Sequence, residues 1–109
     1  MTVIARLALT GRQAGTPDVA ISVEIGVPYE VGEGGWACPV SVQPLHERLP
    51  DIHGAESFQA LLLAMRLALH LLENYTERGG ALFLEDGDAF PFDAYVMNFG
   101  RGNRLNPAP

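Results

Sequence analysis

Asp-Val-Ala-Ile-Ser-Val-Glu-Ile-Gly-Val, residues 18–27, is the stretch that decides the fold. Every second residue in it is branched and apolar: Val19, Ile21, Val23, Ile25 and Val27. Polar or small residues occupy the alternate positions. Because side chains alternate between the two faces of a strand, this pattern predicts a strand with one face on a core and one near solvent. Such one-sided strands are typical of antiparallel sheets.

Two further strands are predicted on either side of this one. Residues 3–10 place Val3, Ala5, Leu7 and Leu9 on one face, and a loop rich in Gly and Pro follows at residues 11–17. The third strand covers about residues 36–45, with Trp36, Cys38, Val40 and Val42 on one face. Pro39 has no amide hydrogen, so this strand is expected to lie at an edge or to contain a bulge there. Residues 44–53 are expected to be irregular.

A long helix is predicted over residues 55–78. Gly54 or Ser57 is the expected cap at its start, and the Gly79–Gly80 pair is the expected left-handed stop. A broad apolar stripe is expected to face the sheet, formed by Phe58, Leu61, Leu62, Met65, Leu69, Leu72 and Tyr75.

Residues 81–85 and 90–96 are predicted to form a hairpin around the Asp86-Gly87 turn, with Phe90, Phe92, Ala94 and Val96 on the core side. The predicted fold is therefore a two-layer α+β domain of order β-β-β-α-β-β. One long helix packs across one face of an antiparallel sheet. Residues 1–99 are expected to form a single domain, and residues 100–109 a flexible tail.

The composition excludes several classes of protein. The chain has 109 residues, a net charge of −6 and 48 % hydrophobic residues. This apolar content is too high for a disordered chain, and the acidic balance argues against a nucleic-acid partner. No apolar run reaches the roughly 20 residues that cross a bilayer, so no membrane association is expected. A single cysteine excludes an internal disulfide, and a cytoplasmic location is expected.

The residues that could carry chemistry do not form a recognised motif. Cys38 alternates with apolar neighbours, as expected of a buried structural thiol. His46, His53 and His70 show no spacing typical of metal ligands. No catalytic residue, metal or cofactor is therefore predicted, and the chain is expected not to be an enzyme. A pocket near Tyr29, Trp36, His46 and His53 is the alternative, which would make the chain a small ligand-binding protein or enzyme.

The charge is distributed unevenly along the chain. Residues 73–93 contain six acids and one base, Arg78, which gives −5 of the total −6. One interpretation is an acidic surface that attracts a basic partner, and the other is a solvated face that aids solubility. The candidate partner-binding residues are Glu73, Glu77, Glu85, Asp86 and Asp88, with His70 nearby.

Three segments resemble a set of small uncharacterised bacterial proteins. They are Trp-Ala-Cys-Pro-Val at residues 36–40, Gly-Ala-Glu-Ser-Phe-Gln-Ala-Leu at 54–61, and the Glu-Asp-Gly-x-x-Phe-Pro hairpin at 85–91. The likeness covers about residues 19–96 and transfers no catalytic residue. At the level of fold and composition, small acidic α+β proteins are also similar to the immunity proteins of bacterial toxin systems.

The leading hypothesis is a non-enzymatic protein-binding module. It would be an immunity protein or inhibitor that neutralises a cognate, basic toxin or effector through its acidic surface. The alternative is a homo-oligomeric accessory protein of unknown pathway. In that case, the excess apolar width that Leu67 and Leu71 give the helix would be buried in a homodimer.

Overall fold

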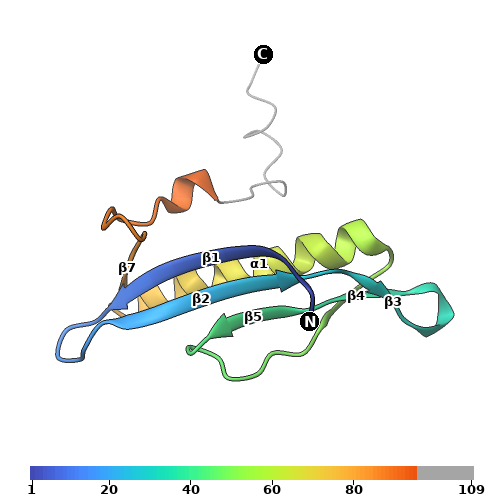
Figure 1. The fold of residues 1–109 in the computed structure, drawn as a ribbon, viewed down its shortest axis with the longest axis horizontal. Coiled ribbons are helices and arrows are strands. Elements are labelled where there is room, and N and C mark those ends of the chain that lie inside the picture. Colours follow the sequence, from blue (N-terminus) through green and yellow to red (C-terminus); the bar gives the residue numbers. More distant parts are fainter. Residues whose placement is uncertain (96–109) are drawn as a thin grey trace, which may run out of the picture.

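The computed structural model describes residues 1–95, which form two antiparallel sheets and one long helix (Figure 1). The helix, α1 (Ser57–Glu77), packs against the sheets. The predicted α+β class is thereby confirmed, and the predicted tail at residues 100–109 lies outside the described residues. The strands are β1 (Val3–Arg12), β2 (Val19–Gly26), β3 (Tyr29–Glu30), β4 (Trp36–Cys38), β5 (Val40–Gln43), β6 (Ile52–Gly54) and β7 (Ala81–Phe83).

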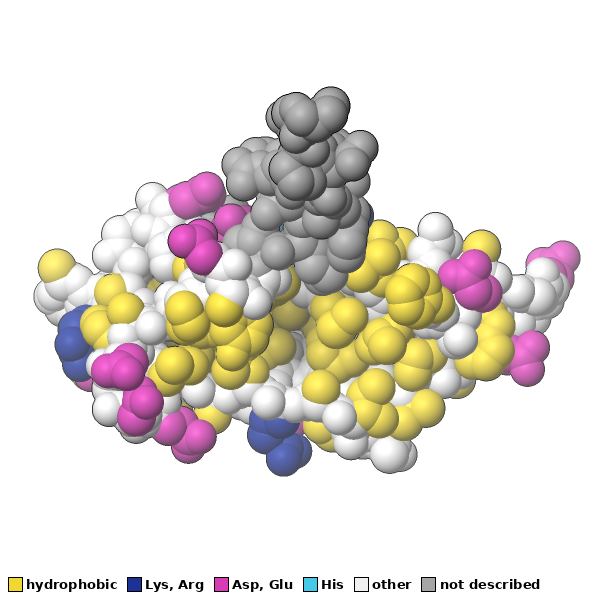
Figure 2. Space-filling model, turned by 90° about the horizontal axis from the view of Figure 1, so that it is seen from above, with side chains coloured by type: hydrophobic (Ala, Val, Ile, Leu, Met, Phe, Trp, Pro, Cys, Tyr) yellow, Lys and Arg dark blue, Asp and Glu magenta, His cyan; other side chains and the backbone are white. Residues whose placement is uncertain are grey.

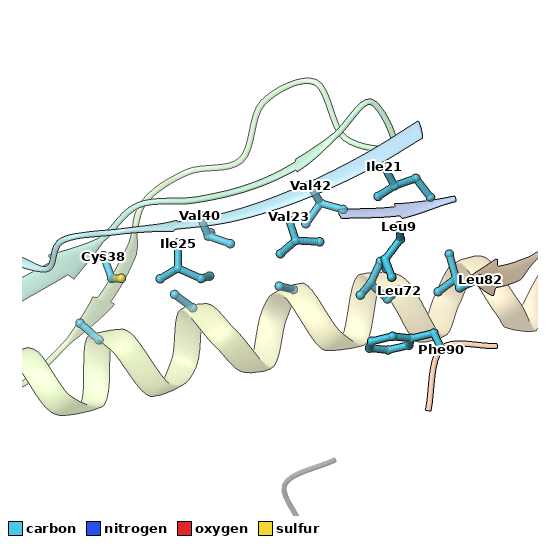
Figure 3. Close-up of a cluster of buried hydrophobic side chains, with 13 residues drawn as sticks. Leu9, Ile21, Val23, Ile25, Cys38, Val40, Val42, Leu72, Leu82 and Phe90 are labelled. Carbon is cyan, nitrogen blue, oxygen red and sulfur yellow. The ribbon is translucent and has the colours of Figure 1, made fainter. Parts of the chain in front are cut away.

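The larger sheet has the strand order β5-β2-β1-β7 and is built around the alternating pattern of β2. Ile21, Val23 and Ile25 are buried, whereas the residues between them are only partly buried, as predicted. Val27 lies beyond the end of β2 and is exposed. The side chains of Val23, Ile25 and Val40 point from this sheet toward α1 (Figure 3).

Pro39 divides the predicted third strand between the two sheets. Before it, β4 pairs with β3 and β6 in the smaller sheet, of order β3-β4-β6. After it, β5 pairs with β2, so that Val40 lies opposite Ile25. Pro39 cannot donate a hydrogen bond, but its carbonyl oxygen accepts one from the amide of Gly26 at 2.9 Å. One strand with an edge position or a bulge at Pro39 was expected; the structure has two strands there, of which β5 lies at the edge of the larger sheet.

The expectation of irregular structure up to residue 53 was wrong for its last two residues. Ile52 and His53 belong to β6, where they pair with Cys38 and Ala37, and Gly54 pairs with Trp36. Three residues give too short an alternation to be recognised in the sequence, and β4 supplies the hydrogen bonds that hold the segment extended.

The ends of α1 are capped by side-chain and glycine contacts. The N-cap is Glu56, whose carboxylate accepts from the amide of Gln59 at 2.8 Å, so the expected cap at Gly54 or Ser57 was wrong. The side chain of Gln59 in turn accepts from the amide of Ala55 at 2.6 Å, completing a reciprocal cap. At the other end, Gly79 has φ +96° and Gly80 donates to the carbonyl of Tyr75, as predicted for a left-handed stop.

The fully buried residues of α1 are mostly small, whereas most of the predicted stripe is only partly buried against the core. Ala60, Ala64 and Ala68 recur every four residues and are at most 3 % exposed, and Leu72 continues the row. Of the predicted stripe only Leu72 is buried, and Phe58 is 74 % exposed. Alanines let the helix backbone approach the sheet closely, which turns the larger side chains of the stripe to the flanks.

The predicted C-terminal hairpin is only partly formed. Its turn is present: Gly87 has φ +94°, and the amide of Leu84 donates to the carbonyl of Asp88 at 2.7 Å. The prediction of a second strand was wrong. A single bridge joins Phe83 to Ala89, and a 3-10 helix follows at Phe92–Ala94. Phe90 is buried, Phe92 is half-buried and Ala94 is exposed, while Val96 lies outside the described residues.

Candidate functional site

The five candidate carboxylates occupy two consecutive parts of the chain. Glu73 and Glu77 lie on the last turns of α1, and Glu85, Asp86 and Asp88 lie in the hairpin after β7. All five residues are exposed, and we refer to them together as the acidic surface. Only residues 78–80 separate the end of α1 from β7, so both parts lie at the same end of the molecule (Figure 1). His70 is also exposed, one helical turn before Glu73.

The charges of the acidic surface are not neutralised within the described residues. Ion pairs in this part of the chain join Arg6 to Glu24 at 2.8 Å and Arg12 to Asp18 at 2.9 Å. Acidic side chains gather at the end of the molecule that carries β7, with a second group at the opposite end near β3 (Figure 2). The carbonyl groups at the C-terminus of α1 add partial negative charge to that of Glu73 and Glu77.

One member of the acidic surface also has a structural role. The carboxylate of Asp86 accepts a hydrogen bond from the amide of Asp88 at 2.9 Å, which stabilises the turn at Gly87. A variant that tests the charge should therefore leave Asp86 unchanged or replace it with Asn, which keeps an acceptor.

Cys38 is a buried thiol in a setting that suppresses its reactivity. Its side chain lies in the core, and its Sγ atom donates to the carbonyl of Gly26 at 3.4 Å. Burial raises the pKa of the Cys38 thiol, and the negative charge of Asp51 raises it further. The reactive thiolate is thereby disfavoured, which fits the structural role expected from the sequence.

We expect the thiol of Cys38 to react with a disulfide reagent such as Ellman's reagent at least about a hundredfold more slowly in the native protein than in urea. The reason is that the reagent reaches the thiol only after the core opens. An Ala14→Cys variant, which adds a thiol in the exposed loop before β2, should react rapidly by one equivalent. Rapid native labelling of the unmodified chain would contradict the burial of Cys38.

The alternative pocket residues do not line a common hollow, although Tyr29, Trp36 and His53 lie on neighbouring strands of the smaller sheet. Tyr29 lines a hollow of about 660 Å³, but Trp36, His46 and His53 do not. His46 lines a separate hollow of about 240 Å³ with Tyr75 and Arg78. The larger hollow is also lined by Asp51, whose carboxylate accepts a hydrogen bond from the Tyr29 hydroxyl. This hydrogen bond raises the pKa of Tyr29. These two residues are 22 positions apart, and no sequence pattern connects them.

Neither a metal cluster nor a membrane helix is found within residues 1–95. No group of three or more His, Cys, Asp and Glu side chains in this range could hold a metal ion. No helix in the same part of the chain is long and apolar enough to cross a membrane.

Comparison with known proteins identifies a family without assigning an activity. The family described as "Domain of unknown function (DUF6968)" matches residues 5–94, so the chain belongs to this family. The expectation of an uncharacterised family is confirmed at this level. No curated protein and no solved structure matches the chain.

Proposed function

We propose that this member of the DUF6968 family is a non-enzymatic protein-binding module whose acidic surface contacts a basic partner protein. The observation that carries this proposal is the position of five exposed carboxylates at one end of the molecule, without an ion pair in residues 1–95. A concentration of one charge attracts a partner of opposite charge and raises the rate of association.

The kind of partner follows from the same charge. A toxin or effector that acts on an anionic substrate presents a basic site, and an acidic protein can cover that site and block it. We therefore propose that the chain acts in a bacterial cytoplasm as an immunity protein, with Glu73, Glu77, Glu85, Asp86 and Asp88 as contacts and His70 at their border. The similarity to immunity proteins in fold class, size and charge supports this finer proposal.

A matched pair of charge variants tests the acidic surface. The test variant carries Glu73→Gln, Glu77→Gln and Glu85→Gln, and the control carries Glu30→Gln, Glu33→Gln and Glu47→Gln. All six residues are exposed and both variants lose three negative charges, so net charge cannot explain a difference between them. The partner is first captured from the native host with the unmodified chain, identified and purified. Its association with each variant is then measured by surface plasmon resonance.

We expect the test variant to associate at least about tenfold more slowly than the unmodified chain, and the control less than about twofold more slowly. Raising the salt concentration should slow the unmodified chain and the control more than the test variant. Equal rates for both variants would remove the acidic surface from the proposal. A captured partner without an activity that the chain inhibits would contradict the immunity function.

A further inference from the structure

A small polar hollow lies where two strands and the helix end side by side. β1 and β5 both pair antiparallel with β2, so they end at the same edge of the larger sheet. α1 ends beside them, because β7 follows it after three residues and pairs with the end of β1 (Figure 1). The hollow has a volume of about 240 Å³ and is lined by five polar side chains: Gln13, His46, Asn74, Tyr75 and Arg78.

The hollow has a positive charge although the chain around it is acidic. The residues at the end of the helix that line it, at positions 71, 74, 75 and 78, are three or four positions apart and so share one side of the helix. Glu73 and Glu77 each follow one of these residues by two positions, which turns them about 160° away around the helix axis. No carboxylate of residues 1–95 lines the hollow, and Arg78 is the side chain there with a permanent charge.

Two glycines fix Tyr75 at the wall of the hollow. A Cβ atom added to Gly11 would lie 2.6 Å from the hydroxyl oxygen of Tyr75, and one added to Gly80 would collide with its ring. The ring is therefore enclosed between two stretches of backbone, where a larger residue in place of either glycine would leave it no room. Its position is set by the backbone and does not depend on flexible neighbours.

The polar side chains of the hollow are not engaged by one another. None of the side-chain hydrogen bonds formed within residues 1–95 involves the side-chain atoms of these five residues. The ion pairs in the same part of the chain belong to Arg6 and Arg12. The hollow therefore collects hydrogen-bonding groups around a space that a small molecule can enter.

The end of the helix does not cancel the charge of Arg78. The carbonyl groups at a helix C-terminus carry partial negative charge, which repels an anion. Here the carbonyls of Asn74, Tyr75 and Thr76 accept hydrogen bonds from the amides of residues 78–80 at 3.0–3.1 Å, so they are occupied within the chain. The full charge of the guanidinium also exceeds the roughly half charge of a helix end.

We propose that this hollow binds a small organic carboxylate. The planar guanidinium of Arg78 can donate two parallel hydrogen bonds to a carboxylate, and the hydroxyl of Tyr75 and the two amide side chains can donate further ones. Leu45 and Leu71 also line the hollow and offer contact to a short carbon chain. Pockets for drug-sized ligands measure about 300–1,000 Å³, so this smaller hollow fits a ligand of a few carbon atoms.

Inorganic phosphate fits the hollow less well than a carboxylate. Phosphate has no apolar part to contact Leu45 and Leu71, and it carries more charge than one guanidinium neutralises. The inference is independent of the proposed function, since it uses no residue of the acidic surface.

Butyrate and butyramide form a matched pair of probes, because they have nearly the same shape and only butyrate is charged. Each is titrated into the unmodified full-length chain at neutral pH and followed by proton–nitrogen NMR. We expect saturable shifts at Asn74 and Arg78, and an affinity at least about fivefold higher for butyrate, since charge-assisted hydrogen bonds are the stronger ones. Equal affinities, or shifts that do not saturate, would overturn the site. Tighter binding of inorganic phosphate than of butyrate would overturn the assignment to a carboxylate.

Two charge variants then locate the site. Arg78→Gln removes the guanidinium from the hollow, whereas the control Arg66→Gln removes one that is exposed roughly three turns earlier in α1. Both variants lose one positive charge, and circular dichroism checks that both are folded. We expect Arg78→Gln to bind butyrate at least about tenfold more weakly than the unmodified chain, and the control less than about twofold more weakly. Equal affinities of the two variants would overturn the proposal, and the comparison of the two probes needs no variant at all.

Discussion

A Gly54→Ala substitution is expected to destabilise the protein by about 3 kcal/mol or more. Gly54 is the last residue of β6 and pairs with Trp36, and the first turn of α1 passes directly over it. An added Cβ atom would lie 2.5 Å from the amide nitrogen of Ala60 and 2.9 Å from its Cα atom. Overpacking usually costs about 1–3 kcal/mol, and here the obstacle is helix backbone that no rotamer change can move.

Urea unfolding followed by circular dichroism measures this change, with Gly32→Ala as the matched control. A Cβ atom at Gly32 would meet nothing within 4 Å. The free energy of unfolding of the control should therefore stay within about 1 kcal/mol of that of the unmodified protein. The main effect of the substitution there is a lower conformational entropy of the unfolded chain. If Gly54→Ala were as stable as the control, α1 would not be seated on β6 as the structure has it.

Strand periodicity was the part of the fold that could be predicted most directly. The alternation in β2 has the period of a half-buried strand, and Pro39 interrupts pairing wherever it lies, because it lacks an amide hydrogen. The left-handed stop at Gly79 and the turn at Gly87 were likewise found from their residue types, since positive φ angles favour glycine. Each of these features is decided by the residue itself or by its near neighbours.

The features that were missed depend on distant partners. β6 is extended because β4 lies beside it. The hydrogen bond between Tyr29 and Asp51 joins β3 to the segment before β6. The core-facing side of α1 was missed because large apolar residues were taken as the buried ones. Where a helix approaches a sheet closely, small residues fit and large ones are displaced to the flanks.

The acidic surface was predicted from the uneven distribution of charge along the chain, and the structure adds the position of its members. Its members are exposed, and the Asp86 carboxylate in addition accepts a hydrogen bond from the amide of Asp88. Sequence periodicity could not reveal that β7 pairs with the last three residues of β1, because strand pairing is decided by the path of the whole chain.

An Ala64→Leu substitution is expected to destabilise the protein by about 2–3 kcal/mol. Ala64 has no exposed surface and lies at the centre of the alanine row that contacts the core. A leucine there must push α1 away from the sheet or adopt a strained rotamer. Arg66→Leu introduces the same side chain two residues later at an exposed position, where the expected change is within about 0.5 kcal/mol.

Leu62→Ala completes the comparison, because it removes a large side chain from the stripe that the sequence predicted to be buried. Truncating a leucine in a packed core costs about 2–5 kcal/mol. Leu62 is only half-buried and lies outside the core cluster, so we expect a loss of about 1 kcal/mol in urea unfolding. If Leu62→Ala were the more damaging change and Ala64→Leu harmless, α1 would present its large residues to the sheet.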